Sequence, residues 1–343
     1  MKKKIYKYYT QFKFKGLVSF SKNYFLKINN ETKFKKKRYR FGNRNPKKIF
    51  YVIKRSPGAG LFSNFLFVLK NINYALKNNY IPIVDMKNFP TKYNELKNIY
   101  NIKNVWELYF NQVSNYKLSD VYKSKNVIIC SDNFRVKLND YENKNIKKTF
   151  KKKIKINKLI INETNIFYKK YFTKYKNIIG IHIRGTDQKI TPGHHLPPTI
   201  FDILTIIEKN ISLNKNIKFF IVTEEKKYLD TLKKKYHNKI IYFDSFRANN
   251  INDFNKSKRK FHRNKLGLES LKESIILSYC EEIYFCKSNI PLFSILLNNK
   301  IRVRNELFNG INVRNPILAY YKWYVTVLPI SFVKYLLFKI KLL

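Results

Sequence analysis

Short apolar runs alternate with amphipathic runs through the second half of the chain, and this alternation constrains the fold more than any other feature of the sequence. Four runs with helical spacing separate five strand-like runs, which are residues 178–184, 217–223, 239–243, 282–286 and 300–304. Strands that alternate with helices predict βαβ units, and the nearly continuous apolar character of each run predicts a parallel sheet covered by helices on both faces.

The first half of the chain begins in the same way. An apolar run at 49–55 is followed by a Gly-rich turn at 56–60, a run with helical spacing at 61–79 and a second apolar run at 80–86. We therefore predict an α/β protein of two Rossmann-like, doubly wound domains that face a cleft at the carboxyl ends of their strands. The predicted segments are a basic aromatic leader at 1–48, an N-terminal domain at 49–165, a C-terminal domain at 166–308 and an apolar helical tail at 309–343.

The charge of the chain favours anionic partners. Its 343 residues carry 70 Lys and Arg against 22 Asp and Glu, a formal net charge of +48. Such a field attracts phosphates, nucleotide sugars and acidic lipids. The lysines are spread along the whole sequence, and we find no zinc-finger, RNA-recognition or helix-turn-helix pattern, so nucleic acid is not the expected partner. Cys130, Cys280 and Cys286 border apolar runs, which indicates buried thiols in a reducing compartment rather than disulfides or a zinc site.

Both ends of the chain suit a membrane surface. Residues 1–48 combine 17 Lys and Arg with many aromatic residues and one acid, Glu31. Residues 309–343 are the most apolar part and hold Trp and Tyr beside lysines, but no run is long enough to span a bilayer. We expect a cytoplasmic protein in peripheral contact with anionic lipids at the inner face of a membrane. A solvated leader and a last helix that packs on the N-terminal domain are the alternatives.

The Gly-rich turn of the first half is the first candidate binding element. Gly58 and Gly60 permit a sharp turn and a close approach of the backbone to a ligand, and the helix that follows offers free N–H groups to an anion. Asn64 lies one turn into that helix. The segment lacks the Gly-Lys-Ser/Thr of a P-loop, and a purely structural turn would need the same glycines.

The second candidate is GIHIRGTD, at the end of the first strand of the second half. Alternation along a strand places His182 and Arg184 on the same side. The fork of Arg184 matches the oxygens of a phosphate, His182 can hydrogen-bond a hydroxyl of a nucleotide or sugar, and Asp187 can hold Arg184 or cap the next turn. An ion pair that merely ends the strand is the alternative.

Two further elements follow strands. Asp244 comes directly after the strand-like run at 239–243, and Ser288 with Asn289 lies between a strand-like run and a helical run. The side chains and backbone N–H groups of Ser288 and Asn289 can bind a phosphate, although a plain helix N-cap explains Ser288 equally well.

In their order along the chain, these elements resemble the α1,2-, α1,6- and protein-O-fucosyltransferase families. HIRGTD resembles the His-x-Arg-x-x-Asp motif of these families, and SPGAGLFSN resembles their Gly-x-Phe-x-Asn turn. FFIVTEE is similar to a strand ending in Thr-Asp-Asp, IIYFDS to a segment whose Asp contacts the nucleoside, and ESIILSYCEEIYFCKSNIPLFS to the last motif with its Ser-rich phosphate contacts. The resemblance covers residues 50–300.

The resemblance implies a GT-B fold and an inverting transfer of fucose from GDP-fucose to a glycan or a lipid-linked saccharide, with no metal and no cofactor. Arg184 would neutralise the β-phosphate as GDP leaves. The other implied donor contacts are His182 and Asp244 at the nucleoside end, Ser288 and Asn289 at the phosphates, and Asn64 from the other domain.

The chain departs from these families at two positions. Gly185 follows Arg184 where several members have a second arginine, and Pro192 stands where some α1,6 members place a glutamate as general base. His194 and His195 are the nearest groups able to take a proton from an acceptor hydroxyl near neutral pH, with two plain surface histidines as the alternative. Two other functions compete: transfer from another nucleotide sugar, and non-catalytic binding of membranes or nucleic acid by a polybasic protein.

Overall fold

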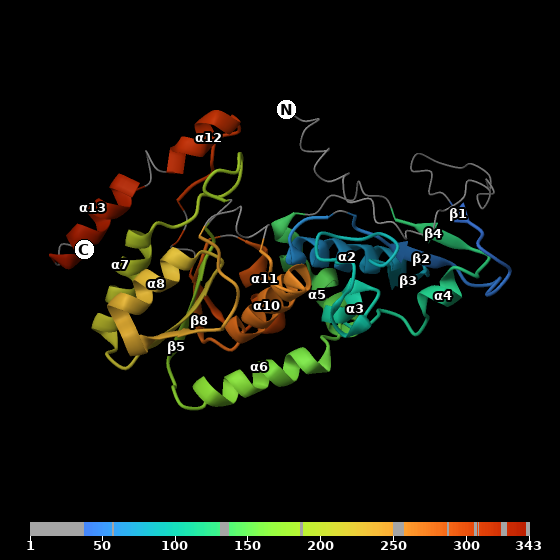
Figure 1. The fold of residues 1–343 in the computed structure, drawn as a ribbon, viewed down its shortest axis with the longest axis horizontal. Coiled ribbons are helices and arrows are strands. Elements are labelled where there is room, and N and C mark those ends of the chain that lie inside the picture. Colours follow the sequence, from blue (N-terminus) through green and yellow to red (C-terminus); the bar gives the residue numbers. More distant parts are fainter. Residues whose placement is uncertain are drawn as a thin grey trace. The chain divides into compact units, whose positions relative to one another are not determined.

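The chain forms two compact units, each built around its own β-sheet (Figure 1). Unit 1 comprises residues 1–160 and 261–268, and unit 2 comprises residues 161–260 and 269–343. The structure is a computed structural model, and it describes residues 38–56, 58–130, 137–185, 188–249, 257–286, 288–304, 307, 309–323 and 328–340.

The sheet of unit 1 has four strands in the order β1-β4-β2-β3. They are β1 (Arg38–Tyr39), β2 (Phe50–Ile53), β3 (Ile81–Val84) and β4 (Val127–Ile129). β2 is parallel to both of its neighbours, as the α/β prediction requires, while β1 pairs antiparallel with β4 at the edge. β1 comes from the end of the segment that we expected to be a leader, and residues 1–37 of that segment lie outside the described residues.

Helix α2 (Leu61–Lys77) packs on this sheet with most of its apolar residues buried. Its Phe65 ring packs against Trp106 and Phe110, with ring centroids 6.4 and 5.2 Å apart. Because burying one such side chain stabilises the fold by about 1.5–3 kcal/mol, this aromatic cluster is a main part of the core of unit 1. The remaining helices of unit 1 are η2 (Ile99–Asn101), α3 (Val105–Tyr109), α4 (Leu118–Val121), η3 (Leu138–Glu142) and α5 (Lys144–Lys153).

The sheet of unit 2 has five parallel strands in the order β7-β6-β5-β8-β9. They are β5 (Ile178–Ile183), β6 (Lys218–Thr223), β7 (Ile240–Tyr242), β8 (Glu282–Phe285) and β9 (Arg302–Arg304). Each falls within one of the predicted strand-like runs, so the prediction of a doubly wound α/β unit is confirmed.

α6 (Lys158–Tyr171) precedes the first of these strands. The helices that connect the strands are α7 (Ile200–Leu213), α8 (Lys226–Tyr236), η4 (His237–Lys239), α10 (His262–Leu277) and α11 (Asn289–Leu297). Thr199 and Asp202 start α7 with a reciprocal capping box. Gly180 lets α10 close on β5, because a Cβ at this position would overlap the side chain of Leu277.

The end of the chain packs on unit 2. It contains α12 (Pro316–Lys322) and α13 (Leu328–Lys339), and α13 packs along α7. The ring of Phe201 on α7 contacts Phe332 and Tyr335, with centroids 5.1 and 5.8 Å apart. The alternative in which the last helix packs on the N-terminal domain is therefore wrong. Of the helices that the structure describes, none has the length and apolar content of a membrane-spanning segment.

Candidate active site

His182, near the end of β5, is completely buried in unit 2. Neither ring nitrogen has a hydrogen-bond partner among the described residues. Burial, aided by the charge of Arg184, lowers the pKa of His182 to about 3, so the ring is neutral at physiological pH and offers one donor and one acceptor. Since an unpaired buried polar group costs about 1–3 kcal/mol, this imidazole is a group that a bound ligand would satisfy.

Arg184 follows the last residue of β5, and its side chain is 37% exposed. Its Nε lies 3.7 Å from Oε1 of Glu224, the first residue after β6. The same carboxylate oxygen accepts a 2.9 Å hydrogen bond from the backbone N–H of Gly185. The strand-end ion pair of the sequence analysis is thus present. A contact this long and this exposed stabilises by no more than about 1 kcal/mol, so a phosphate can compete for the guanidinium.

Gly185 is glycine here for a steric reason. A Cβ at this position would overlap the carboxylate of Glu225. That carboxylate is not free to move aside, because it forms a buried ion pair of 2.8 Å with Nζ of Lys189. The Lys189 ammonium also lies 4.7 Å from the ring centroid of Trp323. A larger residue directly after Arg184 is therefore excluded by this buried pair.

The ends of β5 and β8 meet where the strand order of unit 2 reverses. The chain runs from β5 to β6 and β7 on one side of the sheet and then returns to β8 on the other side. In sheets of this kind, ligands bind outside the carboxyl ends of the strands at such a switch point. His182 and Arg184 end β5, and Ser288 and Asn289 follow β8, so these two predicted elements belong to neighbouring strands.

Ser288 precedes α11 but does not cap it. Its hydroxyl makes no hydrogen bond to the helix, and Oγ is buried without a partner among the described residues. The plain N-cap that the sequence analysis kept open is therefore not what the structure shows. Asn289 is the first residue of α11 and is partly exposed. An unpartnered hydroxyl beside the N-terminal N–H groups of a helix is a suitable arrangement for an anion.

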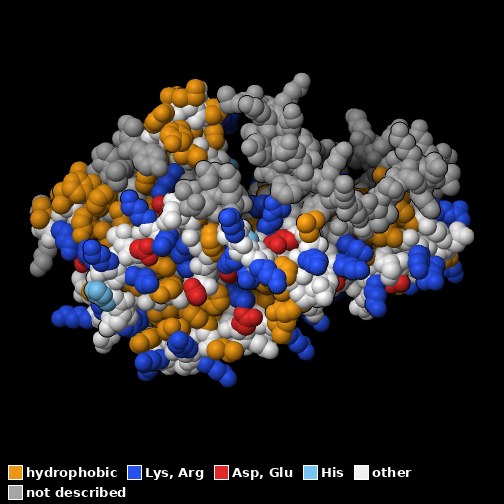
Figure 2. Space-filling model, in the orientation of Figure 1, with side chains coloured by type: hydrophobic (Ala, Val, Ile, Leu, Met, Phe, Trp, Pro, Cys, Tyr) orange, Lys and Arg blue, Asp and Glu red, His pale blue; other side chains and the backbone are white. Residues whose placement is uncertain are grey.

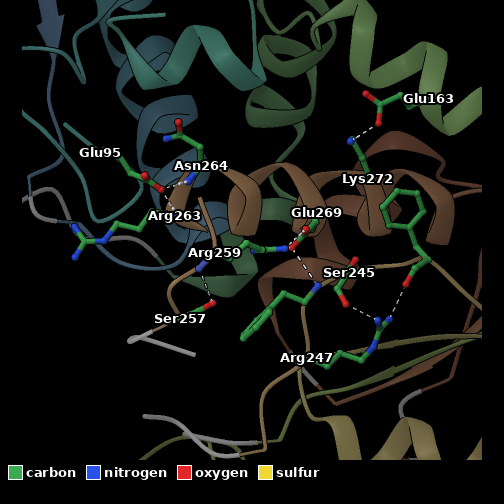
Figure 3. Close-up of polar contacts among 12 residues, drawn as sticks. Glu95, Glu163, Ser245, Arg247, Ser257, Arg259, Arg263, Asn264, Glu269 and Lys272 are labelled. Atoms are coloured by element: carbon green, nitrogen blue, oxygen red, sulfur yellow. Dashed lines mark hydrogen bonds and ion pairs between the residues drawn. The ribbon is translucent and has the colours of Figure 1, made fainter. Parts of the chain in front are cut away.

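Asp244 is exposed in the loop that follows β7, and Arg247 holds this loop in place (Figure 3). The Arg247 guanidinium donates hydrogen bonds to the backbone oxygens of Ser245 and Phe243, at 2.8 and 2.9 Å. It also pairs with Glu273 on α10, with Nη2 3.1 Å from Oε1. The two residues that flank Asp244 are thus fixed by one buried side chain, which limits where the Asp244 carboxylate can lie.

Glu273 is buried within α10. Burial raises the pKa of its carboxyl to about 8, although the nearby Arg247 charge opposes the shift. Glu269, on the same helix, strengthens the anchor of the loop: it accepts hydrogen bonds from Arg259 and from the backbone N–H of Phe246 (Figure 3). The loop after β7 is therefore tied to α10 at two points.

His194 and His195 lie in the loop between β5 and α7, which the tail holds from one side. The His194 side chain is exposed, and its backbone oxygen accepts a 2.7 Å hydrogen bond from Asn312. His195 pairs with Ile311 as an isolated antiparallel bridge, and Leu196 donates to the Gly310 oxygen at 2.9 Å. The structure thus gives His194 access to solvent, as a base that meets an acceptor would need, while the backbone of the loop is fixed.

The Gly-rich turn of unit 1 is held by Asn64. The Asn64 side chain is 2% exposed, accepts from the Ala59 N–H at 2.8 Å and donates to the Ala59 oxygen at 3.2 Å. Gly58 has a φ of +74°, and a Cβ there would overlap the Asn64 amide. Gly60 faces open space and precedes α2. In this structure, Asn64 therefore shapes the turn, which the sequence analysis had left to the glycines alone.

The architecture can be compared with known proteins. No family model and no curated protein sequence matches the chain. A solved structure of NodZ α-1,6-fucosyltransferase co-crystallised with GDP is similar, with a TM-score of 0.50 at 14% identity over 72% of this chain and 92% of that one. The chain has a fucosyltransferase-like GT-B fold.

Two other fucosyltransferase structures are similar at lower scores. A variant of Arabidopsis thaliana FUT1 in complex with GDP has a TM-score of 0.41 and 13% identity over 82% of this chain and 73% of that one. POFUT1 in complex with GDP-fucose has a TM-score of 0.43 and 10% identity over 74% and 96% of the two chains.

Within this GT-B fold, sequence reasoning missed three residues that shape the candidate site: Glu224, Arg247 and Glu273. The available signal for Glu224 is an acidic residue directly after a strand, and the signal for Glu273 is an acidic residue among the apolar residues of a helix. Asp187 lies outside the described residues. The described residues contain no group of three or more His, Cys, Asp or Glu side chains placed to hold a metal ion.

Proposed function

We propose that this protein is a glycosyltransferase that transfers fucose from GDP-fucose, with inversion and without a metal ion. The observation that carries the proposal is the switch point of unit 2. The buried ring of His182 and the cation of Arg184 lie at the end of one strand and the hydroxyl of Ser288 follows the next, and neither the ring nor the hydroxyl has a hydrogen-bond partner among the residues that the structure describes. These groups suit a nucleoside diphosphate. The GT-B fold and a neighbour named as a fucosyltransferase co-crystallised with GDP support the choice of donor.

The roles follow from the chemistry of each group. Arg184 neutralises the negative charge that grows on the β-phosphate as the bond between the sugar carbon and the phosphate oxygen breaks. Ser288, Asn289 and the first N–H groups of α11 bind the phosphates. The proposed contacts at the nucleoside end are His182 and Asp244, and the proposed role of Asp187 is to hold Arg184 or to cap the next turn.

The acceptor oxygen attacks the sugar carbon on the face opposite the leaving GDP, so a single displacement inverts that carbon. The acceptor hydroxyl must lose its proton in this step, and His194 or His195 takes it. The proposed donor contacts of unit 1 are Gly58, Gly60 and Asn64. The two glycines let a backbone come close to a ligand, and Asn64 supports their turn from within, as its hydrogen bonds to Ala59 indicate.

The acceptor in this proposal is a glycan or a lipid-linked saccharide. We place the protein in the cytoplasm, in peripheral contact with the inner face of a membrane. Cys130, Cys280 and Cys286 are buried thiols outside any disulfide, which fits a reducing compartment.

Thermal stabilisation by nucleotides tests the proposal. GDP and GDP-fucose should raise the melting temperature of the protein, whereas UDP, CMP and their sugars should raise it far less. Arg184→Ala should bind GDP at least about tenfold more weakly, because it removes a charge-assisted phosphate contact. Arg302→Ala, an exposed arginine on β9, is the matched control and should bind GDP like the wild type. Stabilisation by UDP-sugars but not by GDP would show that the donor is a UDP-sugar instead of GDP-fucose. The absence of stabilisation by any nucleotide would favour a non-catalytic protein.

A further inference from the structure

The last two helices expose an unusual amount of apolar surface. Eight of the sixteen large apolar side chains that are exposed among the described residues lie between Ile317 and Ile340. Figure 2 shows hydrophobic side chains gathered over the region of α12 and α13. We call this set the tail surface; it consists of Ile317, Leu318, Tyr320, Tyr321, Phe332, Val333, Leu336 and Ile340.

The exposure on α12 follows from how the helix is anchored. Ala319 and Trp323, one helical turn apart, are buried, and the Trp323 indole donates a 3.0 Å hydrogen bond to the Pro197 oxygen. Asn315 caps the helix. With that face turned inward, Ile317 and Tyr321 are left 73% and 59% exposed. The helix thus buries small and aromatic anchors and presents its larger aliphatic and tyrosine side chains to solvent, the reverse of an ordinary surface helix.

α13 is also fixed in place. Besides the ring contacts with Phe201, Lys235 donates a 2.7 Å hydrogen bond to the Tyr335 hydroxyl, and the Lys339 ammonium lies 3.3 Å from Oε1 of Glu208. The outward side chains Val333 and Leu336 therefore belong to a helix that is held on unit 2. Both parts of the tail surface are presented on anchored helices.

The charge of the tail indicates which kind of partner the tail surface binds. Residues 309–343 contain no Asp or Glu and five cations, Arg314, Lys322, Lys334, Lys339 and Lys341. Tyrosines and aliphatic side chains with cations beside them are the composition of segments that lie in the headgroup layer of a membrane. An acidic bilayer complements this charge, whereas a second copy of a chain with a net charge of +48 would be repelled.

We propose that the tail surface docks this protein on an anionic lipid bilayer. The inference deepens the peripheral membrane contact of the proposed function by naming the surface and the lipid charge, and it does not depend on the transfer reaction. The docked tail is joined to the candidate site, because Asn312 and Gly310 bind the backbone of His194 and Leu196. Docking therefore places the loop that carries the proposed base beside the lipid headgroups.

The test uses the full chain and vesicles. Wild-type protein should float with vesicles of phosphatidylcholine and phosphatidylglycerol and bind vesicles of phosphatidylcholine alone more weakly. A variant with Ile317→Ser, Leu318→Ser, Tyr320→Ser and Tyr321→Ser should bind the anionic vesicles at least about tenfold more weakly, since it loses apolar area that enters the headgroup layer.

A matched control separates this surface from general stickiness. It carries four serines at exposed apolar positions elsewhere, Leu96→Ser, Tyr100→Ser, Ile166→Ser and Leu213→Ser, and should bind like the wild type. Circular dichroism and GDP binding check that both variants are folded. Unchanged vesicle binding in the tail variant, or equal losses in both variants, would overturn the proposal. So would a wild-type dimer that the tail substitutions dissociate without any change in vesicle binding, which would make the surface a contact between copies.

Discussion

His182 shows how burial commits a titratable side chain to one protonation state. Its pKa is about 3 in the folded chain against 6.5 for an ordinary histidine, chiefly because the charged ring would have to leave water. Between these pH values the unfolded chain binds a proton that the folded chain does not. The stability from His182 is therefore complete above pH 6.5 and is lost progressively as the pH falls below it.

Replacing the His182 ring should make the free energy of unfolding fall less steeply as the pH is lowered. Between about pH 6 and pH 5, we expect the wild type to lose about 1 kcal/mol more of its unfolding free energy than His182→Gln, which takes up no proton. Urea denaturation at each pH measures the difference. Equal slopes for the wild type and His182→Gln would contradict the buried, neutral state of the ring.

Gly185 offers a steric test of the strand end. Gly185→Ala should destabilise the protein by about 1–3 kcal/mol, because the new methyl group overlaps a Glu225 carboxylate that is held by Lys189. Gly60→Ala is the control: a Cβ at Gly60 meets nothing within 4 Å, so this variant loses only the preference for glycine at the N-cap of α2 and should cost less than Gly185→Ala. Chemical denaturation of both variants decides the matter, and comparable losses would show that the Glu225 contact is not responsible.

At the scale of elements, the loop after β7 depends on α10 through Arg247. Arg247→Ala removes hydrogen bonds to two backbone oxygens and to the Glu273 carboxyl, so we expect a loss of about 1–3 kcal/mol in unfolding free energy. Adding Glu273→Gln removes the buried acid and should restore part of that loss. Arg259→Ala, which breaks a partly exposed pair with Glu269 on α10, should cost less.

The same variants report on the candidate site. Arg247→Ala should weaken GDP binding more than Arg259→Ala does, because Arg247 fixes both neighbours of Asp244. Isothermal titration at a temperature where all variants are folded measures this. If Arg247→Ala binds GDP with the affinity of the wild type, the loop after β7 is not part of the donor site.

The elements of the fold were readable in the sequence because their signals are local. Apolar runs such as 178–184 and 217–223 predict strands, and the glycines at 58 and 60 predict a tight turn, from residues adjacent in the chain. The antiparallel strand β1 was missed, since Arg38 and Tyr39 look like the rest of a basic leader and are strand only through pairing with β4. Its pairing is set by contacts far along the chain, which no local pattern encodes.

The candidate site divides in the same way. The pair His182 and Arg184 was found from strand alternation and a strand end. Three other features depend on tertiary packing. Ser288 does not cap its helix, Glu224 accepts the Gly185 N–H, and the tail binds the loop that contains His194. Local patterns identify the residues at strand ends, whereas tertiary packing decides which of them are already paired.

The whole molecule carries its +48 charge through sequence-wide lysine enrichment, and that charge sets its response to salt. Because 70 cationic side chains outnumber 22 acidic ones, the excess positive charges repel one another, and they do so more strongly in the compact state than in the unfolded chain. Because salt shortens the reach of this repulsion, to about 10 Å at 0.1 M, we expect the melting temperature to rise as sodium chloride is increased from low ionic strength. Differential scanning calorimetry in the absence of nucleotide measures the effect. A parallel series with sucrose, which carries no charge, separates screening from general exclusion of solutes. A melting temperature that falls with sodium chloride would mean that local ion pairs such as Lys189 with Glu225, rather than net repulsion, dominate the electrostatics of the fold.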